Sequence, residues 1–95
     1  MSDIFLSDAS EDLPRVLPLV HALEQHGLSV WWDRTILPGK TFDEVIQDAL
    51  NIARYVVVVW SQASIKSHWV REEAGEGRRR GILVPVLIHS EVRIP

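Results

Sequence analysis

The stretch Tyr55-Val56-Val57-Val58-Val59-Trp60 decides the fold, because all of its residues are apolar. A strand with one wet face alternates apolar and polar residues, whereas a strand covered on both faces is apolar throughout. Helices must then lie on both sides of this strand, as they do around parallel sheets. We therefore predict that residues 55–60 form the central strand of a parallel sheet.

Shorter apolar runs elsewhere in the chain predict the rest of the sheet. They lie at residues 4–6, 28–32 and 82–88, and polar or turn-forming residues bound each of them. Pro85 interrupts the last run. Because proline cannot donate a hydrogen bond to a neighbouring strand, we expect this run at an edge or an irregularity of the sheet.

Between the predicted strands, apolar residues recur at the three-and-four spacing of an amphipathic helix. This pattern predicts helices at residues 13–27, at 41–53 and, more weakly because of two internal glycines, at 69–80. A capping box begins the second helix, and Pro18 requires that the first helix either starts late or bends. Strands and helices that alternate in this way predict parallel β-α-β units with helices on both faces of the sheet.

The length, composition and charge of the chain exclude several classes of site and partner. With 95 residues there is room for one domain, and the absence of cysteine excludes disulfides, thiolate zinc sites and cysteine nucleophiles. The net charge of -3 is spread over mixed residues, and we expect the one basic cluster, residues 78–80, to be a solvated helix end. The chain starts without a basic leader, and no apolar run approaches the ~20 residues that span a bilayer. We predict a cytoplasmic protein that binds neither nucleic acid nor a membrane.

Four short stretches of sequence, called boxes here, carry a more specific signal together, and the first two lie in the N-terminal half of the chain. Residues 3–7 (DIFLS) are followed by 9–12 (ASED), a strand and an acidic loop. Residues 27–33 (GLSVWWD) are followed by 37–39 (LPG) and Phe42, a second strand and a long loop. No single box is specific, so their order and spacing must be considered together with the boxes that follow.

The third box comprises residues 53–61 (ARYVVVVWS), and the fourth comprises 67–73 (SHWVREE) with 84–86 (VPV). Taken in order, the four boxes resemble those of the Toll/interleukin-1 receptor (TIR) domain family, particularly its bacterial members. The long loop in the second box is similar to the BB loop of that family. The resemblance covers nearly the whole chain.

The resemblance implies a flavodoxin-like, three-layer α/β/α fold with a parallel sheet. The family has five strands, so residues 1–95 would form a C-terminally incomplete TIR domain without the fifth strand and the last helix. Two residues depart from the family pattern. Asp8 stands where an aromatic residue commonly follows the first strand, and Trp60 stands where a smaller apolar residue is more usual, so that it either fills the core or narrows a pocket.

Enzymatic TIR domains cleave the bond between nicotinamide and ribose in NAD+, with a glutamate four residues after a tryptophan. The resemblance places this pair at Trp69 and Glu73, and a spacing of four puts both on one helical face. Nicotinamide leaves as a neutral base, so no acid is needed to protonate it. A fixed carboxylate stabilises the oxocarbenium-like ribose and can orient its hydroxyls or an attacking water. From spacing alone, Trp69 would be a core anchor and Glu73 an exposed ion-pair partner. Glu72 is the competing carboxylate and is expected to be solvated.

We expect further substrate contacts after the first two strands, because open α/β sheets bind ligands at the carboxyl ends of their strands. Such contacts are predicted for Ser7, Asp8, Ser10, Asp33 and Arg34. Each of these side chains could instead satisfy a turn. By resemblance, Trp69 is a candidate to stack on a ring of the substrate. Trp60, which departs from the family pattern, is a second candidate if it narrows a pocket.

Other chemistries are disfavoured. His21 and His26 are five residues apart, which does not put two metal ligands on one helical face, so no metal site is predicted. No glycine-rich phosphate loop follows the first strand, and the central strand ends in Trp60-Ser61 instead of the acceptor aspartate of a receiver domain.

The first hypothesis is therefore an NAD+ glycohydrolase of signalling or defence, with NAD+ as its substrate and no cofactor. The family implies activation by self-association, in which the BB loop of one copy completes the site of its neighbour. The alternative is a non-catalytic interaction module that assembles with other TIR domains through the same loop. The pair of Trp69 and Glu73 favours the enzyme, whereas the departure at Asp8 weakens that hypothesis.

Overall fold

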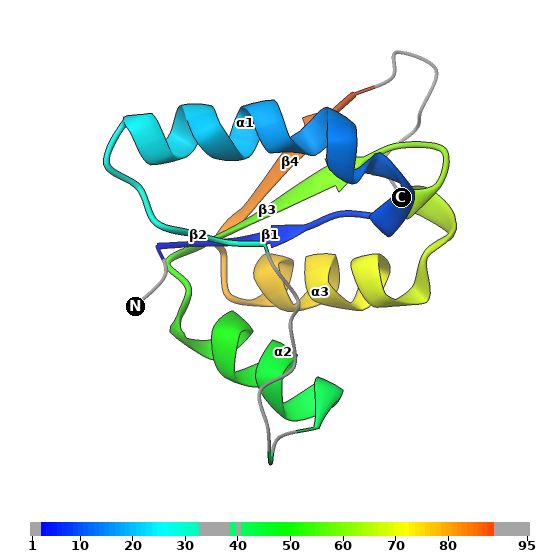
Figure 1. The fold of residues 1–95 in the computed structure, drawn as a ribbon. Helices are drawn as coiled ribbons and strands as arrows, with labels where there is room; N and C mark the ends of the chain where they lie inside the picture. The colour runs from blue at the N-terminus through cyan, green and yellow to red at the C-terminus, as the bar shows by residue number, and fades with distance from the viewer. Residues whose placement is uncertain (1–2, 33–38, 40, 89–95) are drawn as a thin grey trace.

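A computed structural model of the protein describes residues 3–32, 39 and 41–88. Its strands form one parallel sheet in the order β2-β1-β3-β4, where β1 is Ile4–Ser7, β2 is Val30–Trp31, β3 is Tyr55–Trp60 and β4 is Leu83–Leu87. Helix α1 (Leu13–Gln25) covers one face, and α2 (Phe42–Ile52) and α3 (His68–Arg79) cover the other (Figure 1). The predicted three-layer α/β/α arrangement is confirmed.

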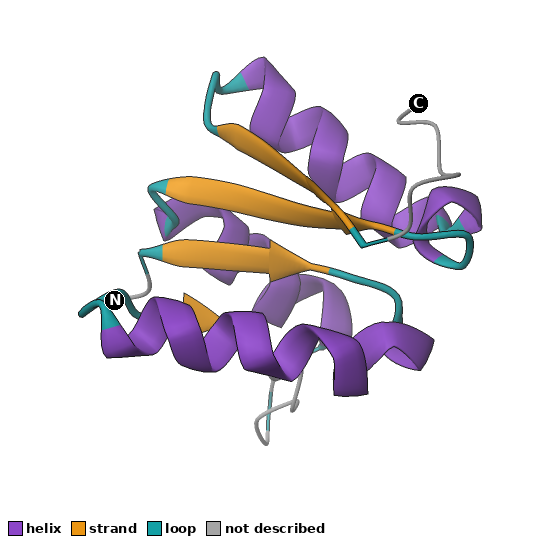
Figure 2. Cartoon of the chain, turned by 90° about the horizontal axis from the view of Figure 1, so that it is seen from above, coloured by secondary structure: helices purple, strands orange, loops and turns teal. Residues whose placement is uncertain are grey.

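Strand β3 lies between β1 and β4 and pairs with both in parallel (Figure 2). Its side chains alternate between the two layers of the core. Those that face α2 and α3 are Val56, Val58 and Trp60. Val57 and Val59 pack on the opposite side, beneath α1. Burial on both faces explains why this strand has no polar residue.

The same alternation in β1 determines what the strand presents to each layer. Ile4 and Leu6 pack on the α1 side. Phe5 faces α2 and α3, where its ring stacks on Trp31 with the ring centroids 5.0 Å apart. Ser7 is two residues further along and therefore points to the same side as Phe5. A buried serine thus lies beneath α3 at the carboxyl end of β1.

Helix α3 approaches the sheet closely at one glycine. A Cβ atom placed on Gly77 would lie 2.9 Å from Cβ of Val56, which is nearer than real carbon atoms pack. The buried face of α3 carries Val70, Glu73, Ala74 and Gly77, at three-and-four spacing. The small residue at position 77 therefore lets this face rest directly on β3.

The C-terminal end of α2 is capped by a side chain from α3. Arg80 donates from Nη1 to the carbonyl of Leu50 at 2.6 Å and from Nη2 to the carbonyl of Ala53 at 3.2 Å. The last carbonyls of a helix have no partner within the helix, so these bonds satisfy them. Residues 78–80 are exposed at the end of α3, as predicted for a solvated helix end, and Arg80 makes these bonds in addition. Arg79 pairs with Glu76.

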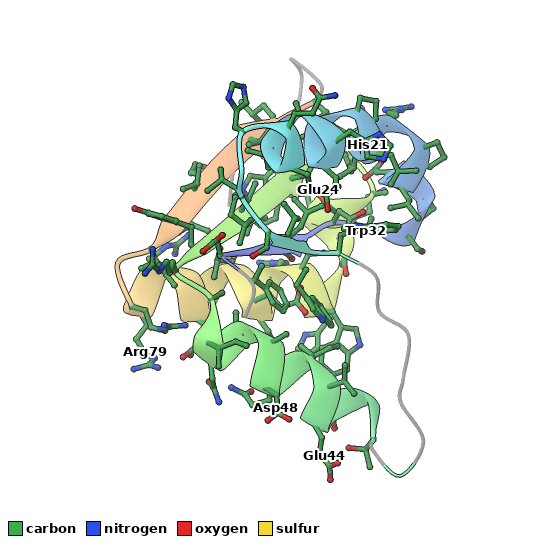
Figure 3. The ribbon with its side chains drawn as sticks, turned by 60° about the vertical axis from the view of Figure 1, so that its left-hand side comes forward. His21, Glu24, Trp32, Glu44, Asp48 and Arg79 are labelled. Carbon is green, nitrogen blue, oxygen red and sulfur yellow. The ribbon has the colours of Figure 1, made fainter. Side chains whose placement is uncertain are left out.

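Several local predictions can now be compared with the structure. The capping box of α2 is confirmed, since Thr41 accepts from the backbone of Glu44 and the Glu44 side chain accepts in return. Glu44 and Asp48 project from α2 away from the sheet (Figure 3). Helix α1 begins at Leu13 and runs through Pro18, so it does not start late. Pro85 lies in β4, the edge strand, as predicted.

Candidate active site

Glu73 is buried and hydrogen-bonded to the first strand. Its side chain is 3% exposed, and the hydroxyl of Ser7, itself 0% exposed, donates to Glu73 Oε1 at 2.6 Å. The bond connects the carboxyl end of β1 to the sheet-facing side of α3. Because a hydrogen bond to a charged group is short and directional, it fixes where this carboxylate lies.

A cavity of about 590 Å³ adjoins Glu73 at the carboxyl ends of β1 and β3. Its walls are the loop after β1, the loop after β3 and the first turns of α3. The lining residues are Asp8, Ala9, Ser10, Glu11, Gln62, Ala63, Lys66, Ser67, Trp69, Val70 and Glu73. The cavity therefore lies where ligands of open α/β sheets bind.

Trp69 forms part of the same wall one helical turn before Glu73. Its side chain is 44% exposed, which is unusual for the largest apolar residue. The arrangement reverses what spacing alone favours, because the indole is accessible and the carboxylate is buried. An accessible aromatic face next to a buried carboxylate can bind a planar ring and stabilise positive charge on an atom close to it.

Glu72 lies on the outer side of α3, as predicted. Its carboxylate is 2.9 Å from Nε2 of His68, and both side chains are exposed. Exposed pairs of this kind contribute little to stability. Two successive glutamates thus have different environments, since one faces solvent and the other faces the cavity.

A buried polar network fixes the two loops that form the cavity. The Ser61 hydroxyl donates to Asp12, and the backbone N–H of Ser61 donates to Ser64 Oγ at 2.7 Å. Ser64 Oγ in turn donates to the carbonyl of Val59 at 2.8 Å. Asp12 ends the 3-10 helix η1 (Ser10–Asp12), and Ser64 begins η2 (Ser64–Lys66). The network therefore holds the walls of the cavity at a fixed separation.

The structure brings together some of the predicted site residues. Asp8, Ser10, Trp69 and Glu73 line the cavity. Ser7 is near it but buried, and its hydroxyl contacts Glu73. The other two predicted contacts, Asp33 and Arg34, lie outside the described residues.

The assignment of a ring-stacking role to Trp60 is corrected. Trp60 is 1% exposed and belongs to the core cluster beneath α3. It is the last residue of β3 on the side of Val56 and Val58, so strand alternation directs its indole under the helix and away from the cavity near Glu73. Trp60 therefore does not line the cavity that contains Glu73.

Sequence reasoning missed Lys66, Gln62 and Ser67, which also line the cavity. All three lie in the polar connection between β3 and α3. The available signal was their position, since they follow the carboxyl end of the central strand. No residue pattern distinguishes them from ordinary loop residues.

This fold and site define an α/β domain with a polar pocket at the carboxyl edge of a parallel sheet. A family model described as the TIR domain matches residues 4–95. The chain therefore belongs to the TIR domain family, as its four boxes predicted. Within the described residues, no helix is long and apolar enough to cross a membrane.

Proteins that resemble the chain include two bacterial relatives and one solved structure. The 2' cyclic ADP-D-ribose synthase AbTIR of Acinetobacter baumannii is 38% identical over 73 residues, which are 75% of this chain and 27% of that protein. The NAD(+) hydrolase PdTIR of Paracoccus denitrificans is 36% identical over 73 residues, 75% of this chain and 24% of that protein. The chain thus spans about a quarter of the length of these relatives.

The solved structure is the TIR domain of the Toll-related receptor TRR-2 from Hydra magnipapillata. It has a TM-score of 0.88 and 27% sequence identity, and the match covers 100% of this chain and 76% of that chain. The similarity in fold extends over the whole chain.

Proposed function

We propose that this domain cleaves NAD+ at the bond between nicotinamide and ribose, with Glu73 as the catalytic residue. The observation that carries the proposal is a buried carboxylate on the wall of a cavity, next to an accessible indole. The names of the relatives support it, because one is an NAD(+) hydrolase and the other makes a cyclic form of ADP-ribose. ADP-ribose is what remains of NAD+ once nicotinamide has left.

The chemistry needs only a fixed negative charge. The nicotinamide ring of NAD+ is cationic and leaves as a neutral base, so no acid has to protonate it. Positive charge develops instead on the ribose, and a preorganised carboxylate stabilises that charge more strongly in a site that excludes water. The same carboxylate can orient the ribose hydroxyls or the attacking water.

Ser7 serves this chemistry by positioning Glu73. A carboxylate has about four lone-pair sites on its two oxygens, so accepting one bond from Ser7 does not exhaust it. The bond restricts the carboxylate to one orientation before the substrate arrives. Trp69 supplies an aromatic face at the entrance, and Asp8 and Ser10 supply polar groups on the opposite wall.

Assembly with other TIR domains through the BB loop is part of the proposal. Most of residues 33–40 lie outside the described residues, so the support comes from the family alone. In this proposal the BB loop of one copy completes the site of its neighbour. NAD+ is then the substrate of an assembled form, and no cofactor is required.

The test is release of nicotinamide from NAD+ by concentrated or artificially clustered protein. Glu73→Gln removes the charge at nearly constant shape, and we expect a loss of about a hundredfold or more in kcat. Glu72→Gln is the matched control, because it makes the same change one residue away on the solvent side, and it should keep the parent rate. Equal rates for all three proteins would refute the role of Glu73. Assembly without turnover in any state would favour the interaction module.

A further inference from the structure

The cavity beside Glu73 is electrically asymmetric. The described residues that line it include the carboxylates of Asp8, Glu11 and Glu73, and Lys66 is the one basic side chain among them. NAD+ is asymmetric as well, with a cationic nicotinamide at one end and a doubly negative diphosphate in the middle. We therefore ask whether the ammonium group of Lys66 matches the negative diphosphate of NAD+, while the carboxylates match its cationic end.

The position of Lys66 is fixed by the loop that carries it. Lys66 ends η2, and its backbone N–H donates to the carbonyl of Ala63 at 3.3 Å. Ser64, at the start of η2, is held by its bonds to Ser61 and Val59. The backbone beneath the lysine is thus anchored in the buried network, while its side chain is exposed at the cavity rim.

Within the described part of the chain, no ion pair neutralises the charge of Lys66. Among residues 3–32, 39 and 41–88, no carboxylate forms an ion pair with it. The adjacent N-terminus of α3, which is capped by Ser67, adds a partial positive charge at the same end of the cavity. Both features attract an anion to this end.

The spacing along α3 between its N-cap and Glu73 suits one half of the substrate. Glu73 lies six residues after the N-cap Ser67, which corresponds to about 9 Å along a helix that rises 1.5 Å per residue. Trp69 lies between them on the same wall. The long, flexible stem of a lysine lets its ammonium group shorten the remaining gap. A nicotinamide ribose at Glu73 would therefore place its phosphate towards Lys66.

We propose that Lys66 binds the diphosphate of NAD+ and so sets the direction in which the substrate lies in the cavity. This inference rests on the proposed function, because it takes the nicotinamide ribose to lie at Glu73. It makes Lys66 a specificity residue that distinguishes dinucleotides from ligands without phosphate. Lys66 takes no part in bond cleavage.

The experiment measures binding without turnover, using magnetic resonance titration of the protein with ADP-ribose and with nicotinamide riboside. Lys66→Ala should raise the Kd for ADP-ribose by about tenfold to a hundredfold, which is the range for a lost charge-assisted hydrogen bond. The same variant should change the Kd for nicotinamide riboside by less than about twofold. Lys66→Arg should retain most of the affinity. Arg71→Ala is the control, since it removes the same charge from α3 at a residue that does not line this cavity.

The outcomes separate this proposal from the proposed function. Loss of ADP-ribose binding in Lys66→Ala alone supports the role of Lys66, even if the protein releases no nicotinamide. If Lys66→Ala and Arg71→Ala weaken the binding of ADP-ribose equally, the loss comes from the lower net charge of the protein, and the proposal is overturned. The proposal is also overturned if the parent does not bind ADP-ribose, or if Lys66→Ala weakens the binding of ADP-ribose and of nicotinamide riboside equally.

Discussion

Replacing Gly77 by alanine should destabilise the domain, although alanine is the better helix former. The new Cβ would lie 2.9 Å from Cβ of Val56 and 3.2 and 3.3 Å from its two methyl carbons. Val56 is fully buried in β3, which is hydrogen-bonded to a strand on each side. The strand therefore cannot move aside, and α3 must shift outward instead.

Two terms of opposite sign determine the magnitude. Alanine in place of glycine stabilises a helix interior by about 1 kcal/mol. Overpacking a well-filled core costs about 1–3 kcal/mol, and the upper part of that range applies because the clash is with a central strand. The net loss should be about 2 kcal/mol, equivalent to a fall in Tm of roughly 10 °C for a domain of this size.

Gly75 provides the control, because a Cβ placed there has nothing within 4 Å. Gly75→Ala should gain about 0.5–1 kcal/mol from helix propensity alone. Urea and thermal unfolding of both variants measure the difference. If Gly77→Ala were as stable as Gly75→Ala, α3 would not rest on β3 as described. Nicotinamide release should also fall in Gly77→Ala, since an outward shift of α3 lengthens the bond between Ser7 and Glu73.

Three further predictions follow from single contacts. The pKa of Asp3 lies below its ordinary value of 3.8, chiefly because the backbone N–H of Ser29 donates to its carboxylate and secondly because the Ser29 hydroxyl does. Asp3→Asn should therefore be less stable than the parent at about pH 6, and the difference should be lost as the pH falls below 3.8. Urea unfolding of both proteins across this pH range measures the difference. Ser7→Ala should lower kcat by about tenfold with KM within about twofold, and Ser7→Thr should restore much of the rate, whereas a change in KM alone would mean that Ser7 contacts substrate. Trp69→Ala should raise KM for NAD+ by about tenfold, and Trp69→Phe should raise it less; equal KM values for all three proteins would exclude a stacking role.

Much of the fold was predictable because it depends on local pattern. The all-apolar run of β3 and the capping box of α2 both specify their elements without reference to the rest of the chain. Strand β2 was predicted at residues 28–32 but comprises only Val30–Trp31. The backbone N–H of Leu28 closes the end of α1, so this residue is not available to the strand. Tertiary hydrogen bonds of this kind leave no mark on hydrophobic periodicity.

The site was less predictable than the fold. The pair of Trp69 and Glu73 was identified through the family resemblance, and spacing alone favoured the opposite burial. Which face of α3 meets the sheet depends on Gly77, and neither propensity nor periodicity specifies that contact. The sequence left open whether Trp60 fills the core or narrows a pocket, and its side chain packs in the core beneath α3. Lys66 lies in a polar connection that carries no helical or strand pattern.

The hydrogen bond between Ser7 and Glu73 joins residues 66 positions apart in the chain. During synthesis, the first strand leaves the ribosome long before the third helix, so this bond forms only when the sheet has closed. Under the function proposed above, this long-range contact makes NAD+ cleavage depend on the completion of folding. A fragment cut between these two elements would lack the bond between Ser7 and Glu73.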